Sequence, residues 1–101
     1  EIIYRIFSDL NITKGSNCIK VDDTIPGLQE GLNAGMWVIG VIFSGNEFGK
    51  NENEFNKLTN KEKLKFRKKI SYKFKKMGAH YVIDTIKDLP KIIDQIENKI
   101  I

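Results

Sequence analysis

Two adjacent carboxylates, Asp22 and Asp23, directly follow an apolar segment of the chain and directly precede a helix start. Residues 18–21 are expected to form a strand, and residues 26–34 are expected to form a helix because Thr24 offers a capping hydroxyl and a proline fits the first turn. Mg²⁺ prefers carboxylate oxygens, and neighbouring acids repel each other unless a cation is present. The pair therefore predicts a divalent-metal site at the carboxyl end of a strand.

A second interpretation of the two acids is a purely structural one. Carboxylates near a first helical turn are favoured by the free backbone amides and by the helix dipole. This accounts for one aspartate but not for two adjacent ones beside a buried strand, where unpaired charge is costly. We therefore favour metal binding.

The elements that must position the acids follow in sequence. Gly35 is expected to end the helix, and residues 36–43 are apolar enough for a strand buried on both faces, which is typical of a parallel sheet covered by helices. In open sheets of this kind, ligands bind beyond the carboxyl ends of the strands. The two aspartates fall at that position.

The first residues of the chain allow two interpretations. Apolar residues at helical spacing predict an amphipathic helix over 2–11, followed by a turn over 14–17. The alternative is a strand that leads into a loop with Asp9 as a nucleophile. Only twelve residues separate Asp9 from Asp22, which is too few for a helical crossover plus a second parallel strand. We therefore favour the helix.

The remainder of the chain continues the alternation of strands and helices. We expect the following order: a loop over 44–60 with one helical turn near 52–58, a basic helix over 61–77 ended by Gly78, a strand over 80–84, and a last helix that Asp88 and Pro90 open and that reaches 101. This order predicts a single α/β domain with a Rossmann-like parallel sheet, right-handed crossovers and helices on both faces.

The net charge of +4 is unevenly distributed. Residues 61–77 hold nine Lys and Arg against one Glu, whereas the rest of the chain is net negative. Periodic apolar positions, Leu64, Ile70, Phe74 and Met77, are expected to face the sheet while the lysines face water. Nucleic-acid binding by these lysines, with Phe66 and Tyr72 at their flanks, is not favoured because no recognised nucleic-acid motif accompanies them. A non-catalytic interaction module remains the alternative, with salt-sensitive contacts through Lys65, Lys68, Lys69, Lys73 and Lys76.

The other reactive or aromatic side chains predict structure rather than chemistry. Cys18 is the only cysteine, so it forms no internal disulfide and is expected to be a buried thiol. Met36, Trp37 and Tyr81 are expected to pack in the core, and His80 to start a strand. With no secretory signal and no segment long enough to span a bilayer, the expected location is the cytoplasm.

Four motifs in the same order carry a family resemblance: VDDT, EGLNAGMW, SGNE and GAHYVIDT. Together they resemble the phosphonoacetaldehyde hydrolase (phosphonatase) family of the haloacid dehalogenase superfamily, and the similarity covers nearly the whole chain. The resemblance implies a magnesium-dependent hydrolase that cleaves the carbon–phosphorus bond of phosphonoacetaldehyde to acetaldehyde and phosphate. Another phosphohydrolase or mutase of the superfamily is the alternative.

The resemblance also implies that residues 1–101 are the C-terminal part of a core domain. The family's nucleophilic aspartate and the Schiff-base lysine of its cap have no counterpart here and are expected upstream. The chain alone is therefore expected to be inactive, with residues 18–21 as an unpaired edge strand. The small-molecule phosphonate or phosphate substrate is its expected partner, and a homodimer of the longer enzyme is compatible with the resemblance.

Only Asp22 and Asp23 can be carried over from the family as functional residues. Asp23 is the stronger candidate for Mg²⁺ contact, with Thr24 as a neighbour that orders the loop. Many superfamily members place a second acid four or five residues after the first, where this chain has Gly27 or Leu28. This departure gives the second acidic role to Asp22, and direct or water-mediated contact stays open for both.

Overall fold

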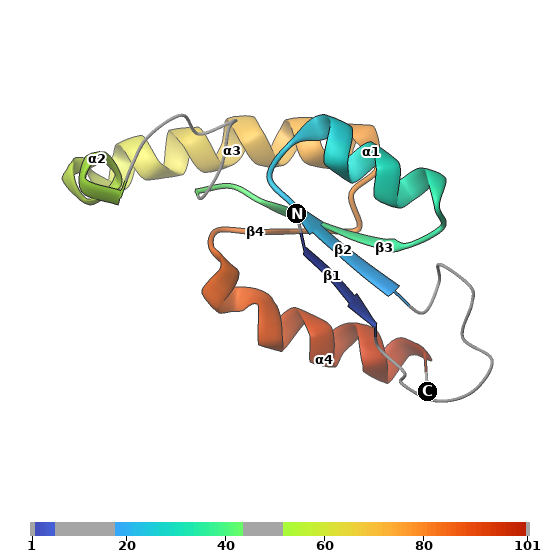
Figure 1. The fold of residues 1–101 in the computed structure, drawn as a ribbon. Coiled ribbons are helices and arrows are strands. Elements are labelled where there is room, and N and C mark those ends of the chain that lie inside the picture. The colour runs from blue at the N-terminus through green and yellow to red at the C-terminus, as the bar shows by residue number, and fades with distance from the viewer. Residues whose placement is uncertain (1, 6–17, 44–51, 101) are drawn as a thin grey trace.

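The computed structural model of the chain describes residues 2–5, 18–43 and 52–100 (Figure 1). These residues form a four-stranded sheet with the strand order β1-β2-β3-β4. The strands are β1 (Ile2–Arg5), β2 (Cys18–Asp22), β3 (Trp37–Val41) and β4 (Tyr81–Ile83). Strands β2, β3 and β4 are parallel, and β1 pairs antiparallel with β2.

Helices cover both faces of this sheet. They are α1 (Ile25–Asn33), α2 (Glu52–Lys57), α3 (Asn60–Met77), the short 3₁₀ helix η2 (Ile86–Asp88) and α4 (Leu89–Ile100). Figure 1 shows α1 and α3 on one face and α4 on the other. The predicted α/β class, with a Rossmann-like parallel sheet between helices, is therefore confirmed.

Side chains that alternate along the strands fill two separate cores. One core lies against α4 and contains Ile19, Val21, Ile39, Val41, Ile83, Leu89 and Ile96. The other lies against α1 and α3 and contains Leu28, Val38, Ile42, Phe43, Ile70 and Phe74. Because successive strand residues point to opposite faces, both layers depend on the same register of β2 and β3.

Gly40 in β3 allows one helix to approach the sheet closely. A Cβ atom at this position would lie 2.4 Å from Cδ2 of Phe74, which is fully buried on α3. The phenyl ring of Phe74 thus occupies the space that a side chain at position 40 would need. This contact fixes where α3 crosses β3.

Local sequence determines both ends of α3. The Thr59 hydroxyl accepts from the Glu62 N–H at 3.1 Å, while the Thr59 N–H donates to Glu62 Oε1 at 3.0 Å. This reciprocal capping box satisfies two backbone donors at the helix start. At the other end Gly78 adopts φ 113°, a left-handed conformation that glycine accepts at little cost.

The predicted helix over 2–11 is wrong at its start, because residues 2–5 form strand β1. Ile2, Ile3 and Tyr4 are residue types that favour strands, and the edge of β2 offers unpaired backbone groups. The expected unpaired edge at 18–21 is wrong for the same reason, since β1 occupies it. The rest of that helix, the turn over 14–17 and Asp9 lie outside the described residues, as does the SGNE motif.

The predicted apolar stripe of α3 is correct only in part. Ile70 and Phe74 are buried, and Met77 packs against them, but Leu64 is 44% exposed. Six positions separate Leu64 from Ile70, so at about 3.6 residues per turn the two side chains lie on different sides of α3 and Leu64 faces outward. Phe66 packs against the buried cluster and is not an aromatic group displayed at the flank of the lysines.

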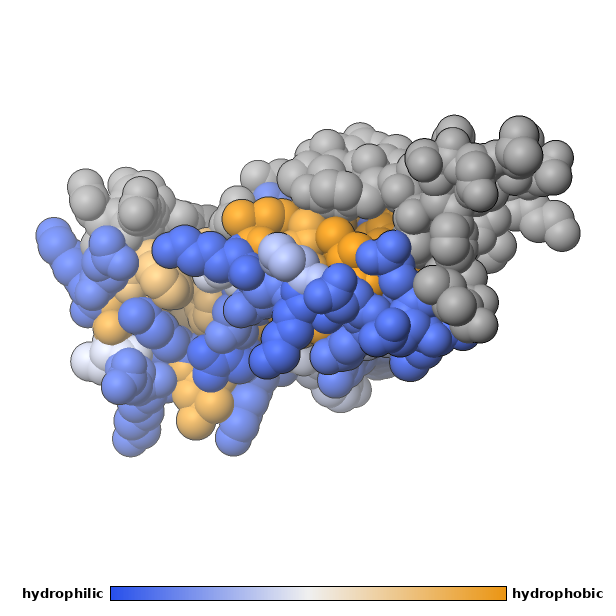
Figure 2. Space-filling view, turned by 90° about the horizontal axis from the view of Figure 1, so that it is seen from below, coloured by the Kyte–Doolittle hydropathy of each residue, from blue (hydrophilic) through white to orange (hydrophobic). Residues whose placement is uncertain are grey.

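The α4 side of the molecule is mostly hydrophilic, with apolar groups gathered between charged ones (Figure 2). Among the helices that the structure describes, none combines the length and the apolar character needed to cross a bilayer.

Candidate functional site

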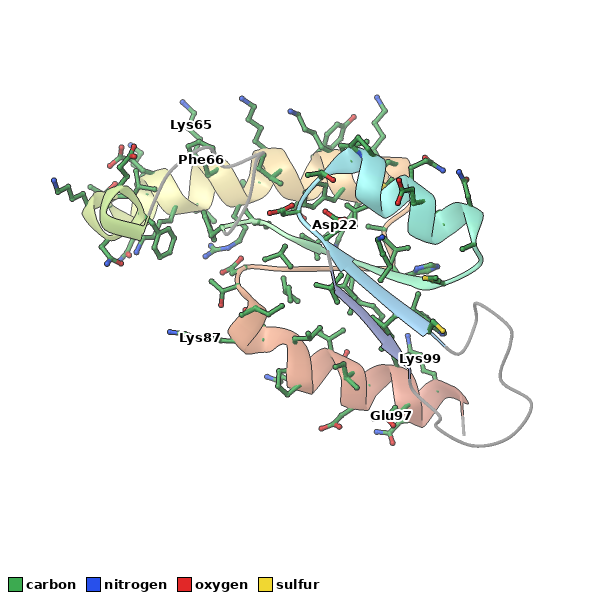
Figure 3. All side chains as sticks on the ribbon, viewed as in Figure 1. Asp22, Lys65, Phe66, Lys87, Glu97 and Lys99 are labelled. Atoms are coloured by element: carbon green, nitrogen blue, oxygen red, sulfur yellow. The ribbon has the colours of Figure 1, made fainter. Side chains whose placement is uncertain are left out.

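The two aspartates lie at the edge of the sheet where the parallel strands end. Asp22 is the last residue of β2, and Asp23 and Thr24 connect it to α1. Figure 3 shows Asp22 next to the first turn of α1. Asp22 is in register with Gly40 of β3, so the carboxyl ends of the three parallel strands meet at this edge.

Asp22 is a buried carboxylate that organises its own loop. Its Oδ1 atom accepts three hydrogen bonds: from the Asp23 N–H at 2.7 Å, the Thr24 N–H at 3.0 Å and the Thr24 hydroxyl at 3.0 Å. The residue is only 8% exposed. These bonds hold the turn that carries Asp23.

Gly27 and Thr24 complete this arrangement from the helix side. Thr24 caps α1, and its hydroxyl accepts from the Gly27 N–H at 3.1 Å. A Cβ atom on Gly27 would lie 1.8 Å from Oδ2 of Asp22. Only glycine therefore leaves room for the carboxylate against the first turn of α1.

The two carboxyl groups differ in their electrostatics. Burial raises the pKa of Asp22, but the hydrogen bonds from Thr24 and Asp23 outweigh it, so its pKa lies below the ordinary value. The pKa of Asp23 is raised, first by burial and then by the adjacent Asp22 carboxylate. A cation beside Asp23 would favour its charged form and offset both effects.

Asp23 is the carboxylate that is available for a ligand. In the described part of the chain, no N–H or O–H group of another residue donates to it, whereas Oδ1 of Asp22 is fully engaged. Its hard oxygen atoms suit Mg²⁺. Among residues 2–5, 18–43 and 52–100, no three His, Cys, Asp or Glu side chains gather around one point. The carboxylate oxygens of this loop thus suit a magnesium ion, but they supply only part of its coordination shell, and further ligands are needed.

A second polar group at this edge was missed in the sequence. Arg67 of α3 donates from Nε and Nη2 to the two carboxylate oxygens of Asp84, which follows β4, at 2.8 and 2.7 Å. The backbone carbonyl of Asp84 also accepts from the Phe43 N–H at 2.9 Å. The pair therefore ties α3 to the ends of β3 and β4. The available indication was a single arginine among lysines, because only arginine makes this bidentate contact.

The residues predicted to be structural have structural contacts. The Val38 N–H donates to Nδ1 of His80 at 2.9 Å, and the His80 ring lies 5.2 Å from that of Trp37. Trp37 and Tyr81 pack at the margin of the α4-side core. The expectation of a buried thiol at Cys18 is wrong, since this residue at the first position of β2 is only half-buried.

Buried Lys20 was also missed. It precedes Asp22 by two residues on the α1 face of β2 and is 2% exposed. Its stem lies beneath Gly31, where a Cβ atom would come within 2.8 Å, and its Nζ lies 3.7 Å from Glu30. The aliphatic part is covered by the helix while the ammonium reaches an acid at the surface.

Comparison with known proteins identifies relatives of the whole described fold. The chain is 44% identical over 93 residues to the phosphonoacetaldehyde hydrolase of Psychromonas ingrahamii, covering 92% of the chain and 32% of that protein. It is 41% identical over 99 residues to the enzyme of the same name from Paraburkholderia phytofirmans, covering 98% and 37%. The matches lie in the C-terminal part of these proteins. The chain therefore spans about a third of the length of its curated relatives. No family model matches it.

A solved structure with a related name is also similar to this chain. The crystal structure of a phosphonoacetaldehyde hydrolase-like protein from Oleispira antarctica matches with a TM-score of 0.83 and 41% identity. The match covers 87% of this chain and 32% of the other. Sequence and fold thus agree on the same relatives.

Proposed function

We propose that this chain, which is homologous to the C-terminal part of phosphonoacetaldehyde hydrolases, provides the metal-binding acids of a magnesium-dependent hydrolase. The proposed reaction of the whole enzyme is cleavage of the carbon–phosphorus bond of phosphonoacetaldehyde to acetaldehyde and phosphate. Because the chain spans about a third of its relatives, we assign the nucleophile, the Schiff-base lysine and the substrate-selecting groups to the rest of the enzyme.

In this proposal the two acids have different roles. Asp23 binds Mg²⁺ directly, because its carboxylate has no competing donor among the described residues. Asp22 positions it, because its own oxygen holds the turn through Thr24 and the Asp23 amide. When bound, Mg²⁺ would neutralise charge on the phosphoryl oxygens of the substrate.

One observation carries the proposal. At the carboxyl edge of the sheet, Asp22 accepts three hydrogen bonds, whereas no N–H or O–H group of another described residue donates to the neighbouring Asp23 carboxylate. The sequence identity of 41–45% to phosphonoacetaldehyde hydrolases supports cleavage of the carbon–phosphorus bond as the proposed reaction.

Phosphate release from phosphonoacetaldehyde in the presence of Mg²⁺ tests the proposal. In the full-length enzyme, Asp23→Ala is expected to lower turnover by about 1000-fold, equivalent to about 4 kcal/mol. Asp94→Ala, which removes an exposed acid on α4, is the matched control and is expected to leave turnover unchanged. Wild-type turnover by Asp23→Ala would contradict the assignment.

The 101-residue chain by itself is expected to release no phosphate, since it supplies two acids and no nucleophile under this proposal. Magnesium-dependent turnover by the chain alone would contradict this part of the proposal.

The alternative function keeps the metal acids but changes the substrate to that of another phosphohydrolase or mutase. This alternative is worth testing because the chain matches only about a third of each relative. The other two thirds of the enzyme would then select the substrate. Relative turnover on phosphonoacetaldehyde and on a panel of phosphate monoesters distinguishes the two. A cytoplasmic location stays a prediction from the sequence.

A further inference from the structure

The outward face of α3 carries six exposed lysines and two exposed apolar residues at steps of three and four, and one exposed acid, Glu62, lies three positions before Lys65 on the same face. This lysine stripe consists of Lys61, Leu64, Lys65, Lys68, Lys69, Tyr72, Lys73 and Lys76. Such spacing aligns side chains along one face of a helix. At a rise of about 1.5 Å per residue the stripe is roughly 23 Å long.

The central charges of this stripe have no ion-pair partner among the residues that the structure describes. These are the charges of Lys65, Lys68 and Lys69. The one arginine of the helix, Arg67, instead forms its pair with Asp84 at the sheet edge. Figure 3 shows Lys65 pointing away from the sheet, on the opposite side of the molecule from Lys87 and Lys99. The stripe is therefore a coherent cationic surface.

Apolar groups are exposed at the same surface. Leu64 is 44% exposed and Tyr72 is 66% exposed, although both are large. A hollow of about 360 Å³ lies beside the first half of the stripe. It is lined by Leu58, Glu62, Lys65, Phe66 and Lys69. An apolar surface is thus set between lysines, with one carboxylate among the lining residues.

We propose that the lysine stripe and this hollow bind an acidic polypeptide segment that carries a large apolar side chain. The carboxylates of the segment lie along the lysines, and its apolar side chain enters the hollow against Leu58 and Phe66. A flat lipid surface does not reach into a concave hollow, and the apolar lining residues Leu58 and Phe66 suit an apolar side chain of a polypeptide rather than a phosphate group. This inference is independent of the enzymatic proposal, because it uses neither Asp22 nor Asp23.

Binding of a fluorescein-labelled peptide of Asp and Glu with one central Phe, measured by fluorescence anisotropy on the full chain, tests the inference. Saturable binding is expected that weakens as salt rises, because exposed charges are screened. The triple variant Lys65→Gln, Lys68→Gln, Lys69→Gln is expected to weaken binding by about tenfold, since each exposed ionic contact contributes modestly. Replacing the Phe of the peptide by Gly is expected to weaken it by about tenfold as well.

The matched control changes the same number of charges on the other side of the molecule, in the variant Lys87→Gln, Lys91→Gln, Lys99→Gln. It is expected to keep the wild-type affinity. An equal loss in the control variant would overturn the inference, because net charge alone would then explain binding. Tighter binding of single-stranded DNA or of anionic phospholipid vesicles than of the peptide would also overturn it.

Discussion

Replacing Gly27 by alanine tests the arrangement of the acidic loop. The new Cβ atom would lie 1.8 Å from Oδ2 and 2.3 Å from Cγ of Asp22, so the carboxylate has to move. Moving it breaks the three hydrogen bonds that Oδ1 accepts from Asp23 and Thr24.

The cost of this movement can be estimated. Three hydrogen bonds at a net value of about 1 to 1.5 kcal/mol each give about 3 to 4.5 kcal/mol. Alanine is more favourable than glycine inside a helix and is expected to add about 1 kcal/mol to the free energy of unfolding. Gly27→Ala is therefore expected to lower the free energy of unfolding by about 2 to 3.5 kcal/mol.

Urea unfolding followed by circular dichroism measures this loss. Gly35→Ala is the control, because a Cβ atom there has no neighbour within 4 Å. This variant is expected to lose only the free energy that alanine needs to adopt φ 75°, about 1 kcal/mol. In an Asp22→Ala background, Gly27→Ala is expected to cost at least about 2 kcal/mol less than in the wild type. A loss below about 0.5 kcal/mol for Gly27→Ala, or additive losses in the double variant, would refute the contact.

Three further predictions concern packing and charge. Gly40→Ala is expected to lower the free energy of unfolding by about 1 to 3 kcal/mol through overlap with Phe74, and Phe74→Leu in the same chain should reduce this loss in urea titrations. A double-mutant cycle of Arg67→Lys and Asp84→Asn is expected to give a coupling of at most about 1 kcal/mol, because both side chains are more than a third exposed. The pKa of Asp22 lies below its ordinary value of 3.8, so its stabilising contribution is present above that pH and is lost as the pH falls below it; acid titration of unfolding should show a shallower loss for Asp22→Asn.

The sequence predicted the segment around the acids well because its determinants are local. A capping threonine, a proline in the first turn and a glycine at the end placed the helix over 26–34, within one residue of α1. The predicted helix over 61–77 likewise lies within one residue of α3, and Gly78 ends it with a positive φ as expected of a glycine at this position. Such signals act within one turn of the residues that carry them.

The predictions failed where contacts distant in sequence decide the structure. Residues 2–5 are compatible with a helical pattern, but pairing with the edge of β2 makes them a strand. Arg67 and Asp84 are seventeen positions apart, and no periodicity connects them. The exposure of Leu64 has a local cause instead, because six positions separate it from Ile70 and about 3.6 residues per turn place the two on different sides of α3.

The sequence predicted the candidate site as a pair of acids, and the family resemblance favoured Asp23 over Asp22 for contact with the metal. Only the geometry adds the physical difference between them, a buried carboxylate that accepts three hydrogen bonds and one that is available. The space at Gly27 that admits Asp22 is likewise visible only once the helix is placed on the strand.

Magnesium titration of the full-length enzyme by isothermal calorimetry tests the different roles of Asp22 and Asp23 most directly. Asp23→Asn is expected to weaken Mg²⁺ binding by more than about 100-fold at an unchanged free energy of unfolding, because it removes a direct ligand. Asp22→Asn is expected to weaken it by about tenfold and to lower stability, since it loosens the turn. Wild-type Mg²⁺ affinity in Asp23→Asn would contradict the account.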